Sequence, residues 1–129
     1  RVQAGFGGRL RVAVSGGAPL PPQVARWLIG LGVPIVQGYG LTESAPIIAA
    51  NALDDNDPST VGRPVAGTEI RFGERQELQV RSASVMRGYW NRPEDTRAVL
   101  SADGWLSTGD QAELIAGRLR IVGRVKEII

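Results

Sequence analysis

Residues 9–37, RLRVAVSGGAPLPPQVARWLIGLGVPIVQ, determine the architecture of this chain. Residues 9–15 alternate between basic and apolar side chains, which predicts a strand with one buried face. Glycines interrupt this strand, and two prolines then open a helix. The short apolar segment 34–37 predicts a second, buried strand. A strand, a glycine turn, a helix and a strand form a βαβ unit, so we expect the two strands to pair in parallel.

Beyond residue 50 the pattern changes to short strands and turns, with a polar loop at 54–58. Residues 45–50 are apolar and fit either a strand or a short helix. We therefore predict an α/β fold: a βαβ portion of a sheet flanked by helices at 1–50, and a mostly antiparallel β region at 51–129. The elements expected in the second portion are strands at 68–72 and 77–82, a helix at 93–100, and strands at 110–115 and 118–122.

Composition limits the chemistry that the chain can perform. Its 129 residues suffice for one domain with a core, and 43% are hydrophobic. The net charge is +2 and basic residues do not cluster with aromatic ones, so we expect no nucleic-acid partner. Cysteine and histidine are absent, which excludes disulfides, Cys or His zinc sites and a Ser-His-Asp triad. Carboxylates, hydroxyls, Lys, Arg, backbone amides and a bound ion remain.

The sequence also bears on membrane insertion and cellular location. No apolar run approaches the ~20 residues that span a bilayer, so we expect no transmembrane segment and a cytoplasmic location. There is no initiator Met, and the last residues read as the middle of a longer protein. We therefore expect a piece of a larger chain, which could expose core surface and self-associate.

The glycine turn at residues 15–19, SGGAP, is the first candidate binding loop. A strand that ends in glycines before a helix exposes backbone N–H groups to an anionic or flat ligand. Gly17, Ala18 and Pro19 are therefore candidate nucleotide contacts. A tight turn without any ligand is the alternative.

Residues 37–43, QGYGLTE, form the second candidate loop, just past the second strand. Ligands bind at the carboxyl ends of strands in open α/β sheets, so both loops are expected to face one crevice. Thr42 offers a donor to a phosphate oxygen, Glu43 an oxygen ligand for Mg²⁺, and Tyr39 a flat face for a base. The alternative is a loop in which Thr42 caps a following helix.

Asp110 and Arg124 are the third candidate pair. Asp110 follows Ser107-Thr108-Gly109, and Arg124 closes the last predicted strand. A carboxylate accepts hydrogen bonds from a cis-diol, and a guanidinium is a rigid fork of donors, so the pair suits a ribose. A surface salt bridge is the alternative.

Three tryptophans and three aspartates fit simpler roles. We expect Trp27 in the core, on a helical stripe with Val24, Leu28 and Leu31. Trp90 and Trp105 are expected to pack the β region. The aspartates of the polar loop lack the spacing of a calcium site, so we predict a solvated loop at Asp54, Asp55 and Asp57.

Taken together, these motifs resemble the adenylate-forming superfamily of acyl-CoA synthetases, luciferases and peptide-synthetase adenylation domains, and most closely its fatty-acyl-CoA synthetase branch. The matching segments cover the whole chain: 15–19, GYGLTE at 38–43, VMRGYW at 85–90, WLSTGD at 105–110, and GRVK at 123–126. In that family a carboxylic acid attacks the α-phosphate of ATP, and coenzyme A then displaces AMP from the acyl-adenylate.

The resemblance assigns roles to single residues. Thr42 would contact the α-phosphate, and Glu43 would hold Mg²⁺; these two are the expected catalytic residues. Lys126 would lie at the hinge to the family's small C-terminal domain. The expected nucleotide contacts are Gly17, Ala18, Pro19, Gln37, Gly38, Tyr39, Gly40, Thr42, Asp110 and Arg124.

The same resemblance sets limits. The family's upstream phosphate loop and C-terminal domain are not in these 129 residues, so we expect the chain alone to be inactive. Gln76 stands where relatives often have glycine. Two other readings stay open: a ligase for an aryl or amino acid, and a non-catalytic nucleotide-binding or interaction module.

Overall fold

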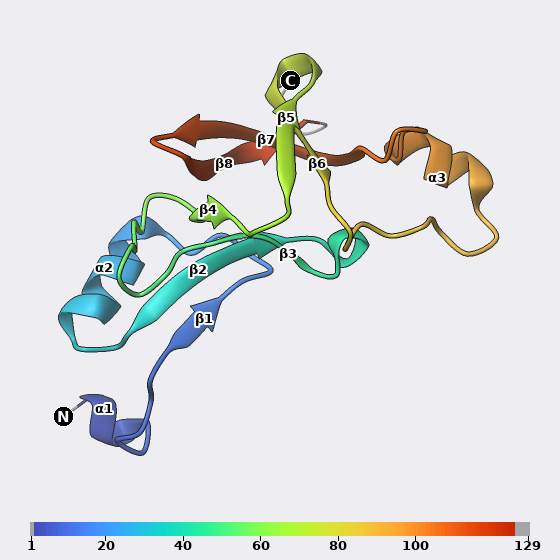
Figure 1. Cartoon of the computed structure of the whole chain (residues 1–129). Helices are drawn as coiled ribbons and strands as arrows, with labels where there is room; N and C mark the ends of the chain where they lie inside the picture. Colours follow the sequence, from blue (N-terminus) through green and yellow to red (C-terminus); the bar gives the residue numbers. More distant parts are fainter. Residues whose placement is uncertain (1, 126–129) are drawn as a thin grey trace.

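The computed structural model describes residues 2–125, which form two four-stranded sheets (Figure 1). The strand order is β1-β2-β3-β4 in the first sheet and β5-β6-β7-β8 in the second. In chain order the elements are α1 (Val2–Gly5), β1 (Ala13–Ser15), α2 (Pro22–Gly30), β2 (Ile35–Gly40), η1 (Thr42–Ser44), β3 (Ile47–Ala50), β4 (Arg63–Pro64), β5 (Glu69–Phe72), η2 (Glu74–Gln76), β6 (Glu77–Arg81), α3 (Pro93–Val99), β7 (Leu106–Ile115) and β8 (Arg118–Arg124).

The predicted βαβ unit is present. β1 pairs in parallel with β2, with Ala13 opposite Ile35 and Ser15 opposite Gln37. β1 is shorter than the alternating segment that predicted it, and β2 runs on to Gly40. α2 lies beside β2 and buries Ala25 (Figure 1). The α/β fold class predicted from the sequence is therefore confirmed.

Residues 45–50, which fitted either a strand or a helix, contain a strand. β3 pairs antiparallel with β2, and β4 pairs antiparallel with β3. The first sheet is therefore mixed, with its one parallel pair at β1 and β2. β1 is the edge strand on that side.

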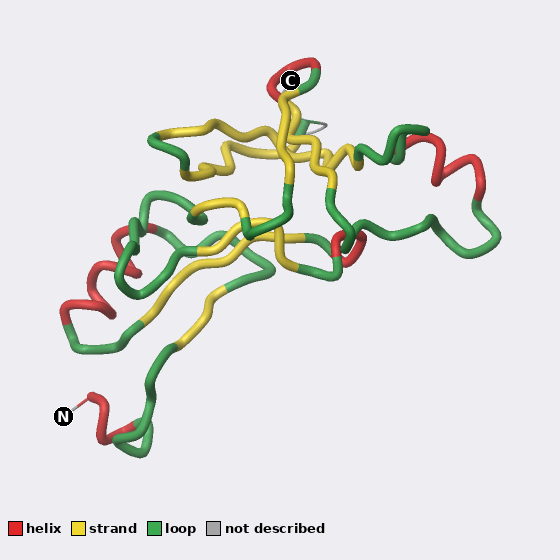
Figure 2. The backbone as a smooth tube through the Cα atoms, in the orientation of Figure 1, coloured by secondary structure: helices red, strands yellow, loops and turns green. Residues whose placement is uncertain are grey.

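The second sheet is antiparallel throughout, in agreement with the mostly antiparallel β region predicted at 51–129. β5 and β6 form one hairpin, and β7 and β8 form the other. The helix expected at 93–100 is α3, which begins at Pro93 with two acidic residues in its first turn. Figure 2 shows that a long loop carries the chain from β6 out to α3, and a shorter one returns it to β7.

The hydrophobic core lies between the two sheets. β3 supplies Ile48 and Ala49, and the second sheet covers them with its own apolar face. Backbone hydrogen bonds also join the two parts: the Val61 amide donates to the Leu119 carbonyl, and the Leu119 amide donates to the Gly62 carbonyl, each at 2.8 Å. The second sheet contributes Leu78, Val80, Leu106, Ala112 and Leu119 to this core.

Two of the three tryptophan predictions are wrong. Trp27 is 61% exposed, because α2 packs through Ala25 and no described element covers its opposite side. Trp90 is 90% exposed, because it lies in the loop before α3. Trp105 is buried as expected, and its ring lies 4.3 Å from the guanidinium carbon of Arg71 and 4.7 Å from that of Arg81.

Asp55, in the polar loop at 54–58, forms ion pairs with two arginines. Asp55 accepts a hydrogen bond from Arg63 Nε at 2.9 Å and also pairs with Arg118 of β8. These pairs tie the loop to both sheets. Among residues 2–125 no group of three or more acidic side chains is arranged to hold a metal ion.

The predicted hinge residue and the predicted lack of a transmembrane segment remain to be compared with the structure. Lys126, the predicted hinge residue, lies outside the described residues. Within residues 2–125 no helix is long and apolar enough to cross a membrane.

Candidate functional site

Gln37 joins the glycine loop to the end of β2. Its side chain is buried, and its Oε1 accepts a hydrogen bond from the Leu20 amide at 3.1 Å. This bond fixes the end of the loop that contains Gly17, Ala18 and Pro19. Gly17 has a φ of +79°, a conformation that side chains disfavour, and all three loop residues are exposed. The two predicted loops therefore meet at the carboxyl end of the parallel pair.

Gly38 and Gly40 lie on β2, where it passes β3. The pairing of the two strands shifts register between Tyr39 and Gly40. A Cβ atom at Gly40 would lie 1.6 Å from the carbonyl oxygen of Pro46, whereas one at Gly38 would meet its nearest atom at 3.6 Å. Gly40 is therefore required by the close approach of two backbones.

Ser44 shapes the turn that presents Thr42 and Glu43. Its Oγ accepts a hydrogen bond from the Leu41 amide at 3.1 Å and lies 2.9 Å from the Leu41 carbonyl oxygen. Ser44 is 1% exposed, whereas Thr42 is exposed. Ser44 therefore closes this helical turn with its side chain. The alternative interpretation assigned that role to Thr42.

Asp110 is the centre of a contact between the two sheets. Tyr39 of β2 donates its hydroxyl proton to Asp110 Oδ2 at 2.6 Å, and Arg124 Nε lies 3.0 Å from Asp110 Oδ1. Asp110 and Arg124 are direct partners in the β7–β8 register. Asp110 is 6% exposed, whereas the Arg124 side chain is 56% exposed, so the salt bridge of the alternative interpretation is present and is buried on its Asp110 side.

Asp110 keeps acceptor capacity in this arrangement. An ionised carboxylate has about four lone-pair sites, and Tyr39 and Arg124 use one on each oxygen. Burial, and then the hydrogen bond to Asp110, raise the pKa of the Tyr39 phenol above its ordinary value. Tyr39 therefore remains a neutral donor at physiological pH, while Asp110 can still accept hydrogen bonds from another partner.

Glu43 faces a different tyrosine. Tyr89 donates its hydroxyl proton to Glu43 Oε1 at 2.7 Å, although 46 residues separate the two in sequence. This hydrogen bond is the largest cause of a raised pKa of the Tyr89 phenol. The sequence contains two tyrosines, so each of them donates to a carboxylate of the predicted site.

One cavity is lined by Glu43 and Arg124 of the predicted site, whereas Thr42, Tyr39 and Asp110 do not line it. It has a volume of about 560 Å³, and its lining includes Glu43, Tyr89, Gly109 and Arg124. A volume in this range suits a small-molecule ligand. The structure therefore places the carboxylate of Glu43 and the guanidinium of Arg124 on one cavity, although 81 positions separate them in the sequence.

The carboxylate at the cavity wall is compatible with a bound Mg²⁺. Mg²⁺ keeps several waters and takes one or two protein carboxylates together with substrate phosphates. Glu43 supplies one carboxylate at the cavity wall, and no cluster of three acidic side chains occurs within the described part of the chain. The donor set thus suits Mg²⁺ shared with a phosphate and does not form a complete protein site.

Sequence reasoning missed three residues that hold this site together. They are Ser44, which closes the turn, Tyr89, which contacts Glu43, and Thr108, whose Oγ accepts from the Asp110 amide at 3.1 Å and donates to the Leu78 carbonyl at 2.8 Å. A serine just after Thr42-Glu43 is a local signal, because a serine hydroxyl often bonds to the backbone a few residues before it. The contact of Tyr89 is long-range and had no local signal.

A comparison with known families decides the relationship. The profile of the family described as AMP-binding enzyme matches residues 2–90. The chain belongs to this AMP-binding family. The long-chain-fatty-acid–CoA ligase FadD15 of Mycobacterium bovis is 41% identical over 130 residues, which cover 100% of this chain and 22% of that protein. The chain thus spans less than a quarter of that relative, and the resemblance to the fatty-acyl-CoA synthetase branch is confirmed.

Solved structures of AMP-binding enzymes agree with this fold. The anthranilate–CoA ligase AuaEII, in complex with anthranoyl-AMP, superposes with a TM-score of 0.83 at 28% identity and covers 92% of this chain and 25% of its own. The O-succinylbenzoate–CoA synthetase MenE from Bacillus subtilis, in complex with AMP, gives 0.81 at 27% identity, with 92% and 27% covered. Both are similar to this AMP-binding chain in architecture.

Proposed function

We propose that this chain is part of an ATP-dependent fatty-acid–CoA ligase. The observation that carries the proposal is a cavity lined by Glu43 and by Arg124, the ion-pair partner of Asp110, in a chain 41% identical to such a ligase. In the proposed reaction a carboxylate oxygen of the fatty acid bonds to the α-phosphorus of ATP, and pyrophosphate leaves. The thiolate of coenzyme A then attacks the acyl carbon, and AMP leaves.

In this proposal Asp110 and Arg124 bind the ribose of ATP. The free lone pairs of Asp110 accept the two hydroxyls, and the guanidinium donates to them. Tyr39 offers its ring to adenine, while its hydroxyl keeps Asp110 in place. The glycine loop and Gln37 border the adenine, and Gly38 and Gly40 lie beside the acyl group.

The proposed phosphate end of the site consists of Thr42 and Glu43. The exposed Thr42 hydroxyl donates to the α-phosphate. Glu43 holds Mg²⁺, which when bound neutralises charge on the transferring phosphates. Because both residues follow β2 directly, the rigid sheet fixes them relative to Tyr39.

The chain alone is expected to be inactive, because it spans 22% of the relative's length. We propose that residues 1–50 and 51–129 are two portions of one larger N-terminal domain of a cytoplasmic enzyme. Lys126 would lie at its hinge to a C-terminal domain. ATP, a fatty acid and coenzyme A are its proposed small-molecule partners, with no nucleic acid.

An aryl acid is the second candidate substrate, since AuaEII and MenE act on such acids by their names. Their identities to this chain are 28% and 27%, against 41% for the fatty-acid ligase, which favours the fatty acid. Asp110, Arg124 and Glu43 would serve either acid, because their proposed partners are the nucleotide and the metal.

Acid-dependent exchange of pyrophosphate into ATP by the complete enzyme tests the proposed function. We expect exchange with fatty acids, and a loss of about 10²–10³-fold in Glu43→Gln and Asp110→Asn, the range seen when a preorganised electrostatic contact is removed. Glu113→Gln is the matched control, because Glu113 lies on the same strand as Asp110 but forms an exposed ion pair with Arg120.

The outcomes separate the candidates. Exchange with aryl acids alone would keep the chemistry and replace the substrate. Full activity in both Glu43→Gln and Asp110→Asn would show that the site is wrongly assigned. No exchange with any acid, in a folded protein with Mg²⁺, would leave a non-catalytic nucleotide-binding module.

A further inference from the structure

Tyr89 contacts the residue that the proposed function assigns to the metal, and the family comparison gives this tyrosine no role. We propose that Tyr89 is a positioning residue, which fixes one oxygen of Glu43 so that the other faces the cation. This inference rests on the proposed function for the role of Glu43. Its basis is the hydrogen bond of 2.7 Å from the Tyr89 hydroxyl to Glu43 Oε1.

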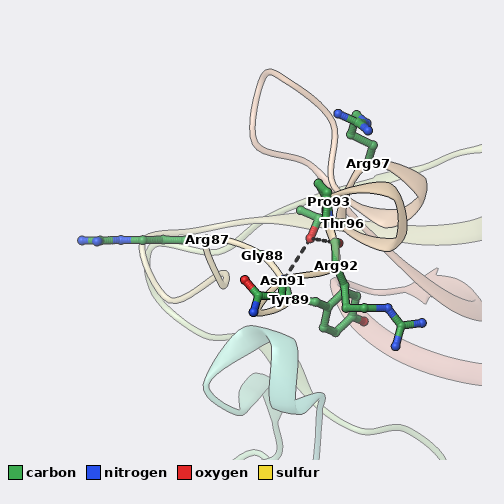
Figure 3. Close-up of a pocket in the computed structure, with 8 residues that line it drawn as sticks. All are labelled: Arg87, Gly88, Tyr89, Asn91, Arg92, Pro93, Thr96 and Arg97. Carbon is green, nitrogen blue, oxygen red and sulfur yellow. Dashed lines mark hydrogen bonds between the residues drawn. The ribbon is translucent and has the colours of Figure 1, made fainter.

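The backbone of Tyr89 is anchored to α3 (Figure 3). The Tyr89 amide donates to Thr96 Oγ1 at 2.9 Å, and the same hydroxyl donates to the Arg92 carbonyl at 2.9 Å. Gly88 has a φ of +148°, and a Cβ there would lie 2.8 Å from Thr96 Cγ2. The chain therefore passes close against α3 immediately before Tyr89, which restricts where the phenol can point.

Glu43 is held from the same segment at its main chain. The Met86 amide donates to the Glu43 carbonyl at 2.8 Å. Residues 86–89 thus contact Glu43 twice, once through the backbone and once through the Tyr89 hydroxyl. Two contacts from one segment fix both the position of the residue and the direction of its carboxylate.

The chemistry of this contact suits a cation ligand. A carboxylate that accepts a phenol proton on Oε1 keeps Oε2 for a cation, and among residues 2–125 no hydrogen bond reaches Oε2. Partners behind a metal ligand orient it, and their loss typically weakens metal binding about 10–100-fold. The surrounding cavity contains both Glu43 and Tyr89, so the contact lies at the site itself.

Direct binding of Mn²⁺ to the complete enzyme with ATP, followed by electron paramagnetic resonance, tests this role in Tyr89→Phe. We expect the Kd for Mn²⁺ to rise by about tenfold, the lower end for such partners. ATP binding without a divalent cation should be unchanged. In pyrophosphate exchange the Mg²⁺ concentration for half-maximal rate should rise equally, and saturating Mg²⁺ should restore kcat.

Trp90→Phe is the matched control, since Trp90 is the neighbouring aromatic residue and is 90% exposed. An unchanged Kd for Mn²⁺ in Tyr89→Phe would overturn the proposal. The same shift in Trp90→Phe, or a loss of kcat that Mg²⁺ does not restore, would also overturn it and indicate a general effect on the fold. A shift in Mn²⁺ affinity in an enzyme without exchange activity would support Tyr89 and reject the ligase proposal.

Discussion

At the scale of single residues, Asp110 is where the two sheets meet in the site. Its two oxygens contact Tyr39 from the first sheet and Arg124 from the second. The same three groups are proposed to bind the nucleoside. Residues that stabilise the fold are thus also those that would hold the ligand, so their substitution changes stability as well as binding.

Tyr39→Phe tests this double role. Removing the hydroxyl deprives the buried Asp110 of a donor, so we expect a loss of about 1.5 kcal/mol in the free energy of unfolding at pH 8. The proposed stacking face remains, so ATP binding should fall less than in Asp110→Asn. Urea unfolding and ATP titration measure the two effects.

The pH dependence of Tyr39→Phe follows from the raised pKa of the phenol. Above pH 10 the unfolded chain loses the Tyr39 proton while the folded chain retains it, so stability falls as pH rises. This contribution is about 1.4 kcal/mol for each pH unit above 10. Urea unfolding between pH 10 and 11 should show a shallower decline in Tyr39→Phe, and equal slopes in both proteins would contradict the assignment.

At the scale of elements, local pattern predicted most of the fold. Period-two alternation located β5 and β6, the turn at Ala116-Gly117 located β7 and β8, and prolines marked the starts of α2 and α3; β7 begins at Leu106, four residues before the predicted strand. The pattern failed where burial depends on distant neighbours. Trp27 has helical spacing yet is exposed, because spacing shows which residues share a face and not what covers that face.

In the candidate site, too, local features were predictable from the sequence and long-range contacts were not. Gln37, Tyr39 and Glu43 were predictable because the end of a strand fixes them locally. The partners of Tyr39 and Glu43 were not, because Asp110 and Tyr89 approach from 71 and 46 residues away. Only the packing of the two sheets, and of the loop before α3 against η1, brings such pairs together.

Gly40→Ala tests the close approach of β2 and β3. A Cβ would collide with the Pro46 backbone at 1.6 Å, so the strands must separate next to Tyr39. We expect a loss of roughly 3 kcal/mol, at the upper end for overpacking, in thermal or urea unfolding. Gly38→Ala is the control, with its nearest atom at 3.6 Å, and equal losses in both variants would exclude this explanation.

At the scale of the whole molecule, the first sheet has an open edge at β1. Val14 on this strand is 67% exposed, and Trp27 and Leu31 at α2 and its C-cap are 61% and 58% exposed. An open strand edge with an exposed apolar side chain is a template for pairing with another chain. The self-association expected from the sequence therefore stays a prediction, now with a defined surface.

We expect the 129-residue chain to associate with itself through β1, as a concentration-dependent rise in sedimentation coefficient. Val14→Lys places a charge on the edge strand and should reduce this association. Val122→Lys is the matched control, because Val122 is 54% exposed on β8. A sedimentation coefficient independent of concentration would contradict the prediction.

The pairing of each tyrosine with a carboxylate has an optical consequence. Tyr39 and Tyr89 are the two tyrosines of the sequence, and they donate to Asp110 and Glu43. Phenolate absorbance of this chain in the near ultraviolet therefore arises from these two positions, with no background from other tyrosines. One spectrum recorded against pH follows the nucleoside end and the phosphate end of the proposed site without an attached label.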